Sequence, residues 1–296
     1  MSELFPGFRR ETLEVNGVHI HAVVGPPKRD APALLLLHGY PQSLAIWHKV
    51  ALRLSQRFNV VAADLRGYGD SSKSAADHSK RAMAKDQVEL MSALGFERFF
   101  LCGHDRGGRV SHRLAVDHPA NVIKLAVLDI APTLAMYEQA SEAFARAYWH
   151  WFFLIRAEPQ PERMIGADPR TFLHETLGAG RPAGLAPFAA EALAEYERCF
   201  TPDAIHCMCE DYRASAGADL IHDRADREAG RKVTAPLLAL WGNDGIIGKL
   251  YQPLDEWRRV AADVRGHGVP GGHYVPEEAA EDLASELEAF FVEEAA

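Results

Sequence analysis

A predicted tight turn between a strand and a helix constrains the fold of this sequence more than any other feature. Residues 99–102 form an apolar, strand-like run, and residues 110–116 have a helical pattern. Between them, positions 103–107 read Gly-His-Asp-Arg-Gly. A turn this tight requires glycine, because a nearby Cβ atom would clash with the backbone. Such a turn lifts its central side chain above the edge of a sheet, so we expect Asp105 to face a cavity.

The side chain at the centre of this turn is a carboxylate with cationic neighbours. An aspartate can attack a saturated carbon and form an ester on the enzyme, which water then hydrolyses. Arg106 and Arg109 are three residues apart at the start of a predicted helix, so they can lie on one side of it. Two guanidinium groups are well suited to bind a substrate carboxylate. The competing interpretation is an ordinary turn pair, because a Gly-x-x-x-Gly pattern often occurs by chance.

The order of predicted elements indicates an α/β fold. An antiparallel hairpin with an Asn-Gly turn comes first. Strand-like runs then alternate with helical patterns, which is typical of a parallel sheet with helices on both faces. After residue 132 no strand pattern occurs until the region of Pro236. We therefore predict an α/β core in two parts, interrupted by a helical cap, with boundaries at 1–132, 133–228 and 229–296.

Composition excludes several kinds of partner. The formal net charge is −9, which argues against nucleic acid and against an anionic membrane surface. The first ten residues have no apolar stretch typical of a signal peptide, and the longest aliphatic run, 33–37, is far too short to span a membrane. Cys207 and Cys209 are too close for an ordinary disulfide and lack zinc-ligand spacing. We therefore expect reduced thiols, a cytoplasmic location and no metal site.

Four motifs, taken together, resemble the α/β-hydrolase fold with a helical cap. They occur in that family's order: His-Gly-Tyr-Pro-Gln at 38–42, a glycine-rich loop at 64–72, the turn at 103–108, and Gly-Gly-His at 271–273. The resemblance covers nearly the whole chain and implies a mostly parallel, eight-stranded sheet. Within the branch that uses an Asp nucleophile, Asp105 followed by Arg106 and Arg109 is similar to fluoroacetate (haloacetate) dehalogenases. The aromatic run at 148–153 also resembles the cap of those enzymes.

This resemblance implies a role for each motif residue. Asp105 displaces halide from the carbon beside the substrate carboxylate, which Arg106 and Arg109 hold. His273 then activates the water that hydrolyses the ester. Asp129, at the end of the strand after the turn helix, is the preferred acid partner of His273. Asp244, at the end of the next strand, remains the alternative.

The resemblance also implies the hydrogen-bond donors of the site. Backbone N–H groups of Tyr40 and Arg106 form the oxyanion hole, and His150, Trp151 and Tyr212 donate to the leaving halide. The other aromatic residues of the run, Trp149, Phe152 and Phe153, are expected to form an apolar core of the cap, and the charges of loop 64–72 are expected to form internal salt bridges.

The function predicted on this basis is hydrolysis of a short 2-haloacid, with fluoroacetate converted to glycolate, without a cofactor. The only partner expected besides this small substrate is a second copy of the chain, because the resemblance implies a homodimer. One alternative is an epoxide hydrolase with the same nucleophile, using tyrosines among Tyr148, Tyr196 and Tyr212. The other is a non-catalytic receptor for a small acid.

Overall fold

The computed structural model describes residues 4–73, 77–178 and 183–293, and eight strands form its single sheet. The strands lie in the order β1-β2-β4-β3-β5-β6-β7-β8. β2 pairs antiparallel with β1 and β4, and every other pairing is parallel. The predicted eight-stranded, mostly parallel sheet is therefore confirmed. The strands are β1 (Arg9–Val15), β2 (Val18–Val24), β3 (Ala33–Leu37), β4 (Asn59–Ala63), β5 (Phe99–His104), β6 (Val122–Leu128), β7 (Leu237–Gly242) and β8 (Val264–Val269).

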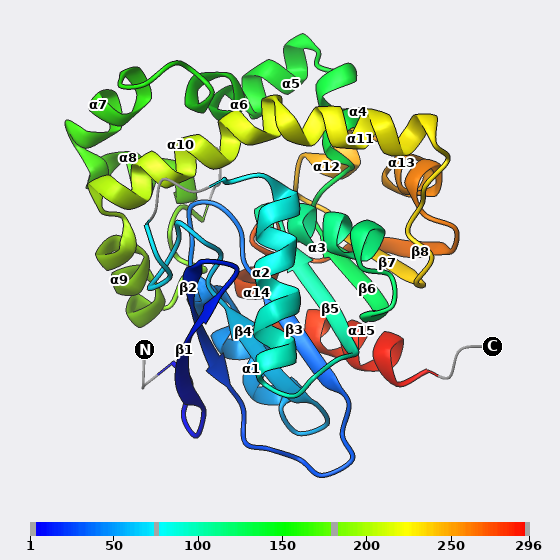
Figure 1. The fold of residues 1–296 in the computed structure, drawn as a ribbon. Coiled ribbons are helices and arrows are strands. Elements are labelled where there is room, and N and C mark those ends of the chain that lie inside the picture. The colour runs from blue at the N-terminus through cyan, green and yellow to red at the C-terminus, as the bar shows by residue number, and fades with distance from the viewer. Residues whose placement is uncertain (1–3, 74–76, 179–182, 294–296) are drawn as a thin grey trace.

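Helices cover both faces of the central strands, which explains why β3, β4 and β5 are buried along their whole length. In Figure 1, α2 and α3 lie in front of the sheet, and α1 and α15 lie behind it. The helices of the core are α1 (His48–Leu54), α2 (Lys80–Ala93), α3 (Arg106–Asp117), α12 (Ile247–Leu250), α13 (Pro253–Val260), α14 (Val275–Glu278) and α15 (Ala280–Val292), with a 3₁₀ helix, η1, at Leu44–Trp47.

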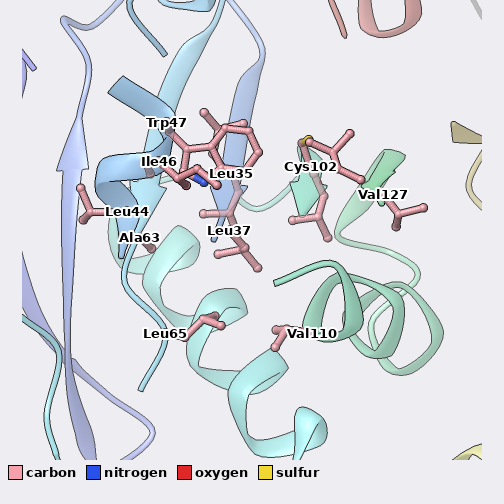
Figure 2. Packing of buried hydrophobic residues seen from close by; sticks show 14 of the residues in the cluster. Leu35, Leu37, Leu44, Ile46, Trp47, Ala63, Leu65, Cys102, Val110 and Val127 are labelled. Atoms are coloured by element: carbon pink, nitrogen blue, oxygen red, sulfur yellow. The ribbon is translucent and has the colours of Figure 1, made fainter. Parts of the chain in front are cut away.

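The apolar core lies on both faces of these strands. Figure 2 shows Trp47 on one side of β3 and Val110 of α3 on the other, with Leu35 of β3 between them and Cys102 on the neighbouring strand β5. All four side chains are fully buried. Each buried aliphatic side chain contributes about 1.5–3 kcal/mol to folding. The strand ends that carry the predicted site therefore rest on a closely packed base.

A helical segment, residues 133–228, separates β6 from β7 and lies over the carboxyl ends of the strands (Figure 1). Its described residues contain no strand. The longest helix, α10, begins where the Thr201 hydroxyl accepts the Ala204 N–H. The helices are α4 (Thr133–Glu138), α5 (Glu142–Ala147), α6 (Trp149–Leu154), α7 (Gln160–Gly166), α8 (Pro169–Gly178), α9 (Ala190–Cys199), α10 (Pro202–Ala216) and α11 (Ala218–Glu228).

The prediction that Trp149, Phe152 and Phe153 form an apolar core of this segment is wrong in part. Trp149 is 49% exposed and Phe152 38% exposed, while Phe153 is partly buried. The residue that enters the core is Trp151, which is 1% exposed. A helix of only six residues buries one narrow face, so most of a six-residue aromatic run cannot enter the core at once. Within the described ranges, no helix is both long and apolar enough to cross a membrane.

Candidate active site

Asp105 lies at the junction of β5 and α3, in the backbone conformation that the turn requires. Its φ is 44° and its ψ is −113°, a region that side-chain-bearing residues rarely adopt. The glycines on either side of it, Gly103 and Gly107, allow the turn to pack closely against the backbone around it. A Cβ atom on Gly107 would lie 2.3 Å from the carbonyl oxygen of His38, and one on Gly103 would lie 2.4 Å from that of Gly107. The backbone therefore holds Asp105 beside the loop that follows β3.

The Asp105 carboxylate is 6% exposed, and a backbone donor fixes one of its oxygens. The N–H of Tyr40 donates to Oδ2 at 3.0 Å. Burial opposes ionisation of this group, but His273, Arg109 and Arg106 outweigh burial and hold its pKa below the usual value. Asp105 is therefore a carboxylate at neutral pH, with Oδ1 outside the hydrogen bond to Tyr40.

His273 and Asp129 meet at the carboxyl end of the sheet. His273 Nδ1 lies 2.7 Å from Asp129 Oδ2, and the Gly242 N–H donates to Asp129 Oδ1 at 3.0 Å. Asp129 follows β6 and also has a positive φ, 50°. Asp244, by contrast, is exposed, and its N–H donates to the carbonyl of Gly271. The geometry thus pairs His273 with Asp129 rather than with Asp244.

A second histidine supports this pair, and the sequence motifs gave it no role. His104 Nε2 donates to the backbone carbonyl of His273 at 2.8 Å, and the two rings lie 4.8 Å apart. Burial and the nearby His273 lower the pKa of His104 to about 3. His104 is therefore a neutral ring that fixes the main chain carrying His273. Its position directly before Asp105 was the only available signal.

Arg106 and Arg109 are both buried, and each has one nitrogen without a hydrogen-bond partner in the described part of the chain. For Arg106 this is Nη1, because Nε and Nη2 donate to Asp211 at 3.0 and 2.6 Å. For Arg109 it is Nε, because Nη1 donates to the carbonyl of Ala131 and to Thr133 Oγ1, both at 3.1 Å. The ion pair with Asp211 was not predicted.

Aromatic residues of α6 and α10 close the site from the side of the helical segment. The ring of His150 stacks on Tyr40 at 5.8 Å and lies edge-on to Tyr212 at 5.8 Å. Trp151 lies 6.3 Å from Tyr212, between the ring centroids. The structure therefore brings together the three predicted halide donors. Burial lowers the pKa of His150 to about 4, so its ring is neutral at pH 7 and can donate one N–H.

The glycine-rich loop 64–72 has a structural environment. Asp64 accepts the N–H groups of Leu44 and Asp70 at 2.7 and 2.9 Å. Arg66 pairs with the buried Asp86. These contacts are internal, in line with the expectation for this loop. Among the residues that the structure describes, no group of His, Cys, Asp and Glu could hold a metal ion.

The fold, with Asp105 at the turn after β5 and with the His273–Asp129 pair at the same edge of the sheet, defines an α/β hydrolase, and the chain belongs to that family. The family model for the alpha/beta hydrolase fold matches residues 32–280. The chain is therefore an enzyme of the hydrolase class, as its motifs indicated.

The chain is similar to individual members of this family that have named activities. A fluoroacetate dehalogenase of Burkholderia sp is 47% identical, over 97% of this chain and 95% of that protein. A soluble epoxide hydrolase of Corynebacterium sp. (strain C12) is 34% identical, over 89% and 90% of the two chains. A solved structure of a putative alpha/beta hydrolase from Nostoc sp PCC 7120 has a TM-score of 0.91 and 48% identity, over 96% of this chain and 98% of that chain.

Proposed function

We propose that this enzyme hydrolyses the carbon–halogen bond of a short 2-haloacid, with fluoroacetate converted to glycolate and fluoride. The observation that carries the proposal is the environment of Asp105. An ionised, buried carboxylate lies beside two buried arginines, each of which retains one nitrogen that has no hydrogen-bond partner among the described residues. An unpaired buried N–H on a charged group is costly unless a ligand satisfies it. A substrate carboxylate would satisfy both, whereas a neutral substrate would leave them unpaired.

In the first step, Asp105 Oδ1 attacks the carbon that carries the halogen. The new bond joins this oxygen to carbon, and the carbon–halogen electron pair leaves with the halide. Oδ2, which accepts the Tyr40 N–H, becomes the carbonyl oxygen of the ester. Arg106 and Arg109 hold the substrate carboxylate so that the carbon is approached from the side opposite the halogen. Such positioning can contribute about 7–11 kcal/mol to lowering a barrier.

In the second step, water attacks the carbonyl carbon of the Asp105 ester. His273 takes the proton of this water, and Asp129 holds the ring and stabilises its charged form. The negative charge that develops on Oδ2 is stabilised by two backbone N–H groups. That of Tyr40 already donates to this atom, and that of Arg106 is the second donor. Collapse releases the hydroxyacid, which takes back the proton, and regenerates the Asp105 carboxylate.

Fluoride binds water strongly, so its departure requires close donors in a site that excludes water. We propose that His150, Trp151 and Tyr212 supply them, since each has an N–H or O–H to donate. All three belong to residues 133–228, which we accordingly propose to be a cap domain over the core formed by 1–132 and 229–296. A homodimer and a cytoplasmic location remain predictions.

A single turnover in heavy-oxygen water tests the proposed route. The enzyme in excess is mixed with fluoroacetate, and the peptide that contains Asp105 is then analysed by mass spectrometry. Label in Asp105 is expected, because water attacks the ester at the enzyme's carbonyl carbon. Label in glycolate alone after the first turnover would show that water attacks the substrate directly, and would overturn the ester mechanism.

Epoxide hydrolysis is the second candidate, because one relative is a soluble epoxide hydrolase. That reaction needs acidic donors for the epoxide oxygen. Tyr196 is already engaged, because its hydroxyl donates to Glu277 Oε1 at 2.7 Å, which leaves Tyr148 and Tyr212. Assaying fluoroacetate, chloroacetate and styrene oxide side by side separates the two functions. Binding of glycolate without turnover of any of these compounds would instead favour the receptor alternative.

A further inference from the structure

Asp211 is a buried carboxylate of α10 that ties the helical segment to the core. It is fully buried and lies directly before Tyr212 in the chain. Its Oδ2 accepts the Tyr68 hydroxyl at 2.7 Å, and its Oδ1 accepts the Lys80 ammonium. The same two oxygens accept Nε and Nη2 of Arg106. Side chains from three parts of the core therefore converge on this one carboxylate.

These contacts occupy two of the three nitrogens of the Arg106 guanidinium and leave Nη1 without a hydrogen-bond partner among the described residues. Asp211 holds Nε at 3.0 Å and Nη2 at 2.6 Å, and Nη2 also donates to Ser215 Oγ at 2.5 Å. The Tyr212 ring covers one face, with its centroid 4.2 Å from Cζ. A planar group held by two parallel bonds keeps one orientation. Only Nη1 lacks a hydrogen-bond partner within the described residues.

Arg109 is held differently, by neutral groups. Its Nη1 donates to a backbone carbonyl and to the Thr133 hydroxyl, and its Cζ lies 4.7 Å from the Trp151 ring. Among the residues that the structure describes, Arg106 forms an ion pair with a carboxylate and Arg109 does not. Asp211 therefore gives Arg106 both a counter-charge and a fixed direction for its remaining nitrogen, Nη1.

We propose that Asp211 is a positioning residue for the substrate carboxylate, holding Arg106 so that Nη1 is free to bind a carboxylate placed beside Asp105. This inference rests on the proposed function. The group is charged in the folded enzyme: burial alone would raise the pKa of Asp211, but Arg106 and Lys80 hold it well below the usual value. The competing explanation is that Asp211 serves only to neutralise the buried Lys80.

Asp211→Asn tests the proposal. It keeps the shape of the side chain but removes the charge that aligns Arg106. A hydrogen bond to a charged group contributes about 1.5–3 kcal/mol, so KM for chloroacetate should rise about tenfold or more, and kcat should fall by a smaller factor. The inhibition constant of acetate, an unreactive carboxylate, should rise in parallel. Acetamide, which lacks the charge, should inhibit both enzymes equally.

Lys80→Met and the double variant separate the two explanations. If Asp211 only neutralises Lys80, the double variant Lys80→Met with Asp211→Asn should recover the KM of the parent enzyme. If Asp211 aligns Arg106, the KM of the double variant should stay about tenfold raised, because Arg106 still lacks its partner. Recovery of KM would overturn the proposal.

Two milder variants, Ser215→Ala and Tyr68→Phe, test the proposal if Asp211→Asn fails to fold. Ser215→Ala removes one neutral acceptor from Arg106 Nη2 and should raise KM about threefold. Tyr68→Phe removes a bond to Asp211 that does not involve Arg106, so KM should stay within about twofold. An unchanged KM in Ser215→Ala contradicts the inference, provided that the parent enzyme releases halide. Absence of halide release by the parent enzyme contradicts the proposed function instead.

Discussion

The two sides of the candidate active site are built by different means. On the core side, Asp105 and Asp129 stand at the carboxyl ends of adjacent parallel strands, each with a positive φ. Their positions are set by backbone geometry. On the side of the helical segment, His150, Trp151 and Tyr212 are positioned by ring contacts and by the ion pair beside them.

This difference indicates a division of labour. The backbone conformation on the core side fixes the groups that make and break bonds, and small changes there should abolish the reaction. Side-chain packing on the helical side fixes the groups that we propose to bind the halide and to orient an arginine, and changes there should alter rate and selectivity by smaller factors. Each prediction below tests whether the two sides can be separated in this way.

The largest effect is expected for Asp105→Asn. Removal of a covalent nucleophile should lower halide release by about 10⁴-fold or more, because the remaining groups only bind and orient the substrate. Ion-selective electrode measurement of fluoride over the first minutes checks this. Slow deamidation would restore Asp105, so Asp105→Ala is the matched control that cannot recover. Full activity in both variants would remove Asp105 from the chemistry.

A slightly smaller effect is expected when the acid partner of His273 is changed. Asp129→Asn should slow ester hydrolysis by about 10⁴-fold, because the ring loses its correct orientation and its stabilising charge. The first step should continue, so the protein should gain mass from the trapped ester, and His273→Asn should show the same adduct. Asp244→Asn is the matched control, and its turnover should stay within about twofold, since its side chain is exposed. An inverted result would make Asp244 the partner.

Changes on the helical side should be smaller and selective for the halide. His150→Phe or Tyr212→Phe removes one donor and keeps a similar ring. Loss of a hydrogen bond to a charged group costs about 1.5–3 kcal/mol, so fluoride release should fall about 10- to 100-fold. Chloride is a better leaving group, so its release should fall less, and the ratio of kcat values for chloroacetate and fluoroacetate should rise. Phe152→Leu, a partly exposed position of α6, should leave this ratio unchanged.

The same division explains what the sequence could predict. The core side is readable because each of its groups belongs to a short motif at the end of a strand, and parallel strands bring such ends to one edge. The sheet and the turn at Asp105 were expected from such motifs, whereas the preference for Asp129 as the partner of His273 came from the resemblance to haloacetate dehalogenases. The choice between Asp129 and Asp244 needed coordinates, because both follow strands of the same sheet.

The helical side is harder to read from sequence. Asp211 lies 105 positions from Arg106 and 131 from Lys80, and no local pattern marks it as their partner. For Asp211, a contact that exists was not predicted. For the aromatic run of α6, contacts were predicted that do not exist, because its composition suggested a core that Trp149 and Phe152 do not join. Packing between short helices depends on their relative placement, which neither composition nor periodicity determines.

The smallest expected effect is the change of halide release with pH. This one measurement depends on a group from each side of the site. Attack requires ionised Asp105 on the core side, and a constant protonation state of His150 on the helical side keeps its donor unchanged. The pKa of Asp105 lies below its usual value and that of His150 near 4, so both groups keep the required form from pH 5 to pH 8. The pre-steady-state burst of halide release should therefore change less than about twofold over this range, as followed by rapid quench. Burial without His273 and the flanking arginines would raise the pKa of Asp105, and the burst would then fall steeply as the pH is lowered towards 5. A steep fall would mean that His273, Arg109 and Arg106 together do not hold Asp105 ionised in solution. The core side would then lack a fixed charge, and the proposed difference between the two sides of the site would not hold.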